Sequence, residues 1–91
     1  MIIISYDISN DKKRAKFNKY IRRFGYMLQY SVYEIENSER ILSNVITDLN
    51  NRWLKQFDQT DSVYIFHMSN SCEIMKYGYA KNEDADLLIV N

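Results

Sequence analysis

The sequence has few of the residues that build metal clusters, disulfides and flexible linkers. Its 91 residues include no proline, two glycines, one cysteine (Cys72) and one histidine (His67). A single cysteine excludes an internal disulfide and a multi-cysteine zinc site, and a single histidine excludes a metal site built on a pair of histidines. So little glycine and proline also leaves little room for a linker, and no glycine-rich phosphate loop is present.

Long hydrophobic runs are also absent. Met1 leads straight into Ile2-Ile3-Ile4-Ser5-Tyr6-Asp7, without a basic segment or an apolar stretch long enough for a signal peptide or a membrane span. A chain of 11.0 kDa can bury one small core, but it cannot enclose a deep active site. We therefore expect a cytoplasmic protein without a membrane contact, whose chemistry takes place on its surface or between subunits.

The charges are balanced in number but not in position. Twelve basic and twelve acidic residues give a net charge of zero. Residues 1–33 carry seven basic and two acidic residues, a charge of +5, whereas residues 34–91 carry five basic and ten acidic residues, a charge of −5. The basic first third suggests an acidic partner, although a solvated helix face would have the same pattern.

Hydrophobic periodicity predicts alternating strands and helices. We expect Gly25 to end the first helix in a left-handed conformation, Ser38 to cap the second helix, and a bulge or tight reversal near residues 30–32. The expected elements are strands at 2–8, 26–36, 62–68, 72–79 and 86–90, and helices at 11–24 and 38–53.

If residues 26–36 form a hairpin, this order is β-α-β-β-α-β, which is the α+β ferredoxin-like arrangement. We assign residues 1–80 to this domain, and residues 81–91 to a tail with an additional C-terminal strand at the dimer or partner interface. Two helices would cover one face of the sheet and leave the other bare. A second copy of the chain is the simplest cover, so we expect a homodimer.

Asp7 is the first candidate for chemistry. It ends an apolar strand immediately before a helix N-terminus, whose partial positive charge favours an anion. A capping or turn residue would occupy the same position. Mg²⁺ can be held by one or two carboxylates together with phosphate oxygens, so two copies of Asp7 could share one ion across a two-fold axis.

The basic helix is the second candidate. Its cations recur at helical spacing and could lie along a phosphate backbone, with affinity that depends on salt and little on base sequence. The candidate nucleic-acid-binding residues are Lys12, Lys13, Arg14, Lys16, Lys19 and Arg23.

Several short motifs, in this order and spacing, resemble one protein family. They are Ile3-Ile4-Ser5-Tyr6-Asp7-Ile8-Ser9, Lys12-Lys13-Arg14-Ala15-Lys16, Gly25, Gln29-Tyr30-Ser31-Val32-Tyr33-Glu34 and Asp61-Ser62-Val63. Over about residues 2–66 the chain resembles the second core family of CRISPR-associated proteins. The resemblance implies a ferredoxin-like homodimer in which Asp7 is catalytic and binds Mg²⁺ at the interface. It also implies that Arg14 and Lys16 contact nucleic acid.

The resemblance implies two functions. The first is a scaffold that binds protospacer duplex DNA together with the CRISPR integrase during spacer acquisition. The second is a magnesium-dependent endonuclease that hydrolyses phosphodiesters of double-stranded DNA or single-stranded RNA. An alternative is a ribonuclease toxin of the related virulence-associated type, which shares the domain.

Overall fold

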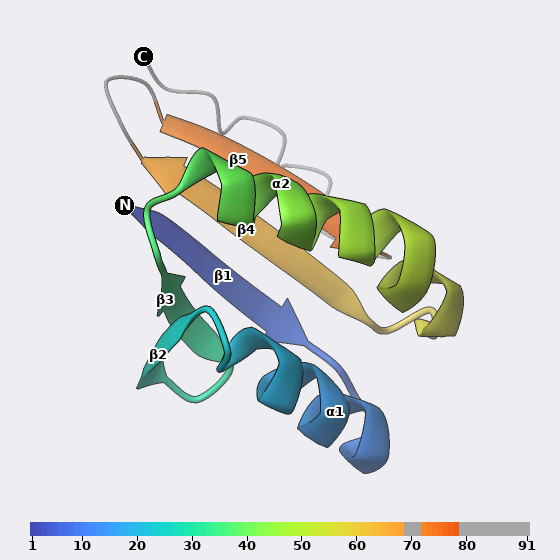
Figure 1. Cartoon of the computed structure of the whole chain (residues 1–91). Helices are drawn as coiled ribbons and strands as arrows, with labels where there is room; N and C mark the ends of the chain where they lie inside the picture. The colour runs from blue at the N-terminus through green and yellow to red at the C-terminus, as the bar shows by residue number, and fades with distance from the viewer. Residues whose placement is uncertain (69–71, 79–91) are drawn as a thin grey trace.

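The fold is an antiparallel sheet covered on one face by two helices (Figure 1). The computed structural model describes residues 1–68 and 72–78. In order, the elements are β1 (Ile2–Asp7), α1 (Asp11–Ile21), β2 (Gly25–Gln29), β3 (Val32–Ile35), α2 (Glu39–Asp48), a π-helical turn (Leu49–Trp53), a 3-10 turn (Leu54–Gln56), β4 (Ser62–Met68) and β5 (Cys72–Gly78). None of the helices within these residues is long and apolar enough to cross a membrane.

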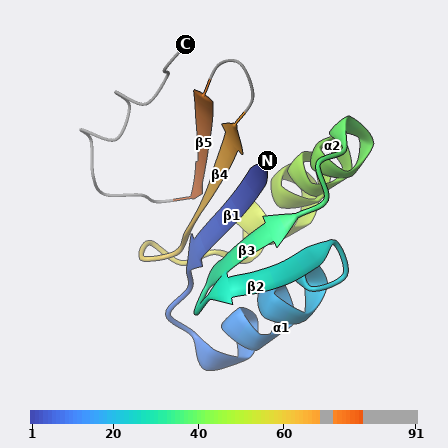
Figure 2. The ribbon, with the colours of Figure 1, turned by 90° about the vertical axis from the view of Figure 1, so that its left-hand side faces the viewer.

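The sheet order is β2-β3-β1-β4-β5, and every neighbouring pair is antiparallel. The first four strands and two helices form the β-α-β-β-α-β arrangement, so the predicted α+β ferredoxin-like class is confirmed, and β5 adds a fifth strand at one edge. The predicted tail strand in residues 81–91 lies outside the described residues. Figure 2 shows β1 in the centre of the sheet, between β3 and β4.

The core lies between the sheet and the helices. Alternate residues of β1 (Ile2, Ile4 and Tyr6) are buried, because successive side chains of a strand point to opposite faces. Phe17 of α1 packs edge-on against Trp53, with 5.0 Å between the ring centroids. Burying a side chain of this size stabilises the fold by about 1.5–3 kcal/mol, so this aromatic contact is a strong link between the two helical segments.

Both helices begin at a capping side chain. The Asn10 side chain accepts a hydrogen bond from the Lys13 backbone amide, and the Ser38 side chain accepts one from the Ile41 amide. Each bond satisfies one of the amides that the first helical turn leaves free. The predicted cap at Ser38 is therefore confirmed, while α1 ends at Ile21, three residues earlier than the pattern over 11–24 predicts.

The prediction that Gly25 ends the first helix in a left-handed conformation is wrong. Gly25 opens β2, and of the two glycines only Gly78 has a positive φ, of 92°. Gly25 is required for another reason, because a Cβ there would lie 1.9 Å from the Glu34 carbonyl oxygen and 2.6 Å from the Ile35 Cα. The predicted reversal is confirmed: Ser31 turns the chain with φ 63°, and the β2–β3 register shifts between Met27 and Gln29.

No helix of the described residues covers the second face of the sheet. Strand alternation and register place five partly exposed apolar side chains on this face, which we call the uncovered face: Ile3, Val32, Tyr64, Phe66 and Ile74. Cross-strand pairs Ile3–Phe66 and Phe66–Ile74 make the apolar surface continuous over three strands. Continuous apolar surface of this kind marks an interaction site more often than a solvated face.

The close approach at Gly25 gives a first testable prediction. We expect Gly25→Ala to lower the free energy of unfolding by about 3 kcal/mol, because the β2–β3 backbones must separate to admit the methyl group. Urea unfolding would measure the loss. Ala15→Gly, on the exposed side of α1, is the control and should cost about 1 kcal/mol through helix propensity alone. An alanine variant as stable as the parent protein would contradict the close approach.

Candidate functional site at the end of the first strand and along the first helix

Asp7 lies at the end of β1 and is exposed. It pairs in register with Ser62 of β4. The buried residues Ile4 and Tyr6 face the helices, so alternation places Asp7 with Ile3 on the uncovered face. The carboxylate is therefore available to a ligand or a second chain on the side of the sheet that the helices do not occupy.

Asp7 offers a metal only one carboxylate. In residues 1–68 and 72–78, no group of three or more His, Cys, Asp or Glu side chains is arranged to hold a metal ion. A hard cation such as Mg²⁺ keeps several waters and can use one or two carboxylates with phosphate oxygens. The donor set of one chain therefore fits an ion shared with a second copy and a nucleic acid, and not an ion enclosed by this chain alone.

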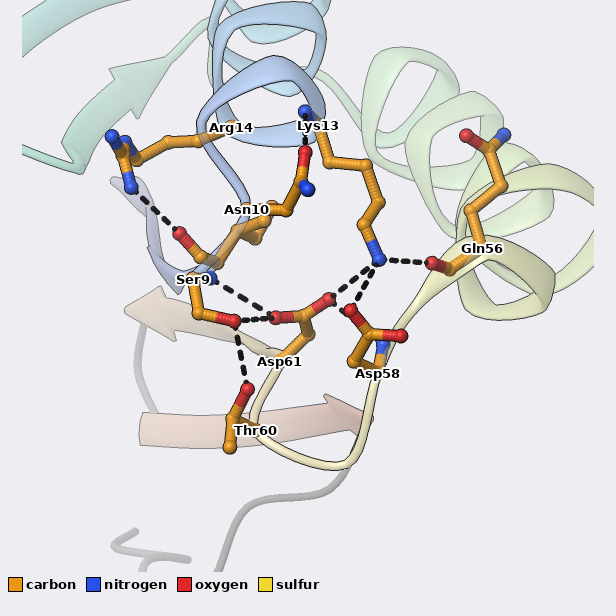
Figure 3. Close-up of polar contacts among 9 residues, drawn as sticks. Ser9, Asn10, Lys13, Arg14, Gln56, Asp58, Thr60 and Asp61 are labelled. Carbon is orange, nitrogen blue, oxygen red and sulfur yellow. Dashed lines mark hydrogen bonds and ion pairs between the residues drawn. The ribbon is translucent and has the colours of Figure 1, made fainter.

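The loop after Asp7 is fixed by a buried carboxylate, that of Asp61 (Figure 3). Asp61 is 0% exposed. Its Oδ1 accepts hydrogen bonds from the Ser9 backbone amide at 3.1 Å and the Ser9 hydroxyl at 3.3 Å. Its Oδ2 accepts one from the Asp58 amide at 2.8 Å and one from Lys13 Nζ at 3.4 Å. We call Asp61 and these partners the Asp61 hub.

The charge of Asp61 is stabilised where it is buried. Burial alone would raise the pKa of its carboxyl group, but the hydrogen bonds from the Asp58 and Ser9 amides and from Lys13 outweigh burial and hold the pKa below its ordinary value. Asp61 is therefore an ionised structural acceptor, and it joins the β1–α1 loop to the turn before β4.

Lys13 and Arg14, two of the predicted nucleic-acid-binding residues, have partners within the chain. Lys13 Nζ donates to the Gln56 carbonyl at 2.7 Å and forms an ion pair with Asp58 at 2.9 Å. Arg14 donates to the Ile8 carbonyl at 3.1 Å and pairs with Asp11. These two cations hold the segment beside Asp7, and a phosphate would have to compete with those contacts.

The remaining predicted cations lie free on α1 or directly after it. Lys12, Lys16, Lys19 and Arg23 are exposed, and within the described part of the chain none of them forms an ion pair. Because α1 covers the helix side of the sheet (Figure 1), these four lie on that side, whereas strand alternation places Asp7 on the uncovered face. The two predicted sites are separate surfaces of one chain.

An open groove of about 800 Å³ runs between α1 and the β2–β3 hairpin. Its lining includes Arg14, Arg22 and Tyr30, the last 73% exposed. Asn18, also in the lining, donates to the Tyr6 and Tyr33 hydroxyls at 2.9 and 2.6 Å. Burial raises the pKa of Tyr6, so its hydroxyl stays neutral and can accept this bond.

Sequence reasoning missed the roles of Asp61 and Asn18. Asp61 is recognisable only as part of the motif Asp61-Ser62-Val63, and its partner Ser9 is 52 residues away. Asn18 lies between the basic residues of α1 without a feature that marks it. A buried acceptor that joins distant segments leaves no periodic signal in the sequence.

Comparisons with known proteins agree on one family. The family model described as "CRISPR associated protein Cas2" matches residues 1–75. A Synechocystis protein named "CRISPR-associated endoribonuclease Cas2 2" is 34% identical over 56 residues, which are 62% of this chain and 57% of that protein. A Methanospirillum hungatei protein of the same name is 33% identical over 75 residues, 79% of this chain and 76% of the relative. No solved structure matches the chain significantly.

The Asp61 hub gives the second prediction. We expect Asp61→Asn to lower the free energy of unfolding at neutral pH by about 2–3 kcal/mol, because buried donors lose their ionised acceptor. The pKa of Asp61 is lower in the folded than in the unfolded chain. Its contribution is therefore complete above pH about 4 and is lost as the pH falls through the folded-state pKa.

Urea unfolding of both proteins from neutral pH down to about pH 2 would test this. The difference between parent and variant should shrink at the acid end. Asp58→Asn is the control, since the Asp58 side chain is 65% exposed and its ion pair is worth at most about 1 kcal/mol. A difference that stays constant with pH would contradict an ionised Asp61.

Proposed function

The chain belongs to the Cas2 family of CRISPR-associated proteins, and we propose that it acts in CRISPR adaptation as a homodimeric scaffold. In this role it binds protospacer duplex DNA together with the CRISPR integrase. The observation that carries the proposal is the row of exposed cations along α1 and directly after it, of which Lys16, Lys19 and Arg23 have no carboxylate partner among the described residues. Such a row neutralises phosphates without reading bases.

The uncovered face supports the homodimer. It is apolar across β1, β4 and β5, and its side chains are only partly exposed. A small chain gains stability when such a surface is buried against an identical one across a two-fold axis. In such a dimer the helices, and the cations that they carry, would remain on the outside.

A metal-dependent endonuclease is the second candidate. The two relatives are named endoribonucleases, and Asp7 ends β1 on the uncovered face. Two copies of Asp7 would hold Mg²⁺ together with phosphate oxygens of DNA or single-stranded RNA. The bound ion would supply positive charge to the phosphate under attack. The role of this chain is to present Asp7 rigidly, which the Ser9–Asp61 bonds two residues later achieve.

Charge reversal on α1 tests the scaffold. We expect the double variant Lys16→Glu, Lys19→Glu to weaken duplex binding at least tenfold and to flatten the dependence of affinity on salt, because each lost phosphate contact removes about 0.9 from the logarithmic slope. Fluorescence anisotropy at several salt concentrations would measure both. Arg40→Glu, an exposed change at the start of α2, is the control. An unchanged slope would mean that the row is only solvated.

Removal of the carboxylate tests the nuclease. We expect Asp7→Ala to abolish Mg²⁺-stimulated cleavage of RNA and DNA while duplex affinity changes less than twofold, because the cations lie on the other side of the sheet. Gel assays with and without EDTA would measure cleavage, and light scattering should give the mass of two chains for both proteins. Cleavage that persists in the purified variant would exclude the role of Asp7.

A further inference from the structure

A second, smaller groove lies on the other side of α1, facing the turns that follow α2. Its volume is about 270 Å³. It is lined by the four cations Lys16, Lys19, Arg23 and Arg52 and by Tyr20 and Gln56. Three of the cations come from α1 or the residues after it, whereas Arg52 comes from the π-helical turn. We call this the α1–π groove.

The charges of the α1–π groove are not balanced within the described residues. The ion pairs that the described residues form involve Lys13 and Arg14, and none of these pairs involves a cation of the groove. One carboxylate lies behind the groove, that of Asp48, which accepts a hydrogen bond from the Tyr20 hydroxyl at 2.6 Å and is not part of the lining. Four cations against one carboxylate leave an excess positive potential that an anion would relieve.

Aromatic rings hold the two guanidinium groups of the groove. Arg52 lies 4.5 Å from the centroid of Trp53 and 5.9 Å from that of Tyr20. Arg23 lies 5.9 Å from Tyr20 and 5.5 Å from Phe24. Tyr20 is 5% exposed and its hydroxyl is fixed by Asp48, so it is a rigid support for both groups. A guanidinium beside a ring loses less freedom when it binds, and its N–H groups can still meet a phosphate.

The π-helical turn determines where Arg52 lies. The helix widens over Leu49–Trp53, which buries Leu49 and Trp53 and leaves Arg52 exposed. Such turns are rare and recur at functional sites. Here the turn directs a cation from the acidic part of the sequence to the basic face of α1.

We propose that Arg52 binds a phosphate of the duplex DNA backbone together with Lys16, Lys19 and Arg23, so that the nucleic-acid surface extends from α1 onto the turn after α2. The inference rests on the proposed scaffold function and adds a contact to it. The ligand is the sugar–phosphate backbone, because four of the six residues that line the groove are cations, and cations neutralise phosphates without reading bases.

Three single variants test this inference. Arg52→Gln removes the charge and keeps a polar side chain, Arg52→Lys keeps the charge, and Arg40→Gln removes an exposed arginine of α2 outside the groove. We expect Arg52→Gln to weaken binding of a short DNA duplex about fivefold and to reduce the logarithmic salt slope by about 0.9. Arg52→Lys should retain the parent slope, and Arg40→Gln should behave as the parent protein does.

The outcomes separate this inference from the proposed function. If the parent protein binds duplex and the Lys16, Lys19 variant does not, but Arg52→Gln matches Arg40→Gln, the contact of Arg52 is excluded while the scaffold stands. If the parent protein binds no duplex, both fail. Arg52→Gln could also act by loss of packing on Trp53. In that case Arg52→Lys would show the same reduced slope, and the contact would be excluded.

Discussion

The buried carboxylate of Asp61 is the interaction on which the arrangement of the molecule depends. A buried charge costs several kcal/mol unless it is hydrogen-bonded or paired. Asp61 meets this requirement with donors from two distant parts of the chain, the segment around Ser9 and Lys13 and the turn at Asp58. These segments cannot separate without leaving the charge unsatisfied. The start of α1 is thereby fixed to the turn that leads into β4, next to β1.

This constraint divides the basic residues of α1 into two groups. Lys13 and Arg14, in the first turn, are bonded to the loops around them. The cations further along the helix remain exposed, and Arg52 joins them from the turn after α2. The first group positions the loop after Asp7, and the second provides the charge that a polyanion would meet. A single basic run in the sequence therefore has two physical roles.

Features of the fold that depend on neighbouring residues could be predicted from the sequence, whereas features that depend on contacts between distant residues could not. The strand–helix order and the cap at Ser38 depend on neighbouring residues, and the structure confirms them. The role of Gly25 depends on the close approach of Glu34 across a hairpin, so helix-end rules assign it wrongly. The partners of the Lys13 side chain lie 43 or more residues away, and a helical charge pattern cannot distinguish a bonded lysine from a free one.

The cationic surface and Asp7 lie on opposite sides of the sheet, and this separation distinguishes the requirements of a scaffold from those of a nuclease. The proposed phosphate binding would use the outer side of α1 and the π-helical turn, both of which lie within one chain. The proposed cleavage would need two copies of Asp7, which lies on the uncovered face, opposite the helices that carry the cations. A dimer closed through the uncovered face would direct the carboxylates inward and both cationic surfaces outward. A duplex held by the cations would then not be pressed against the carboxylates, so binding does not entail cleavage. The distribution of charge alone supports a scaffold, whereas a nuclease also requires that a strand reach the inner face.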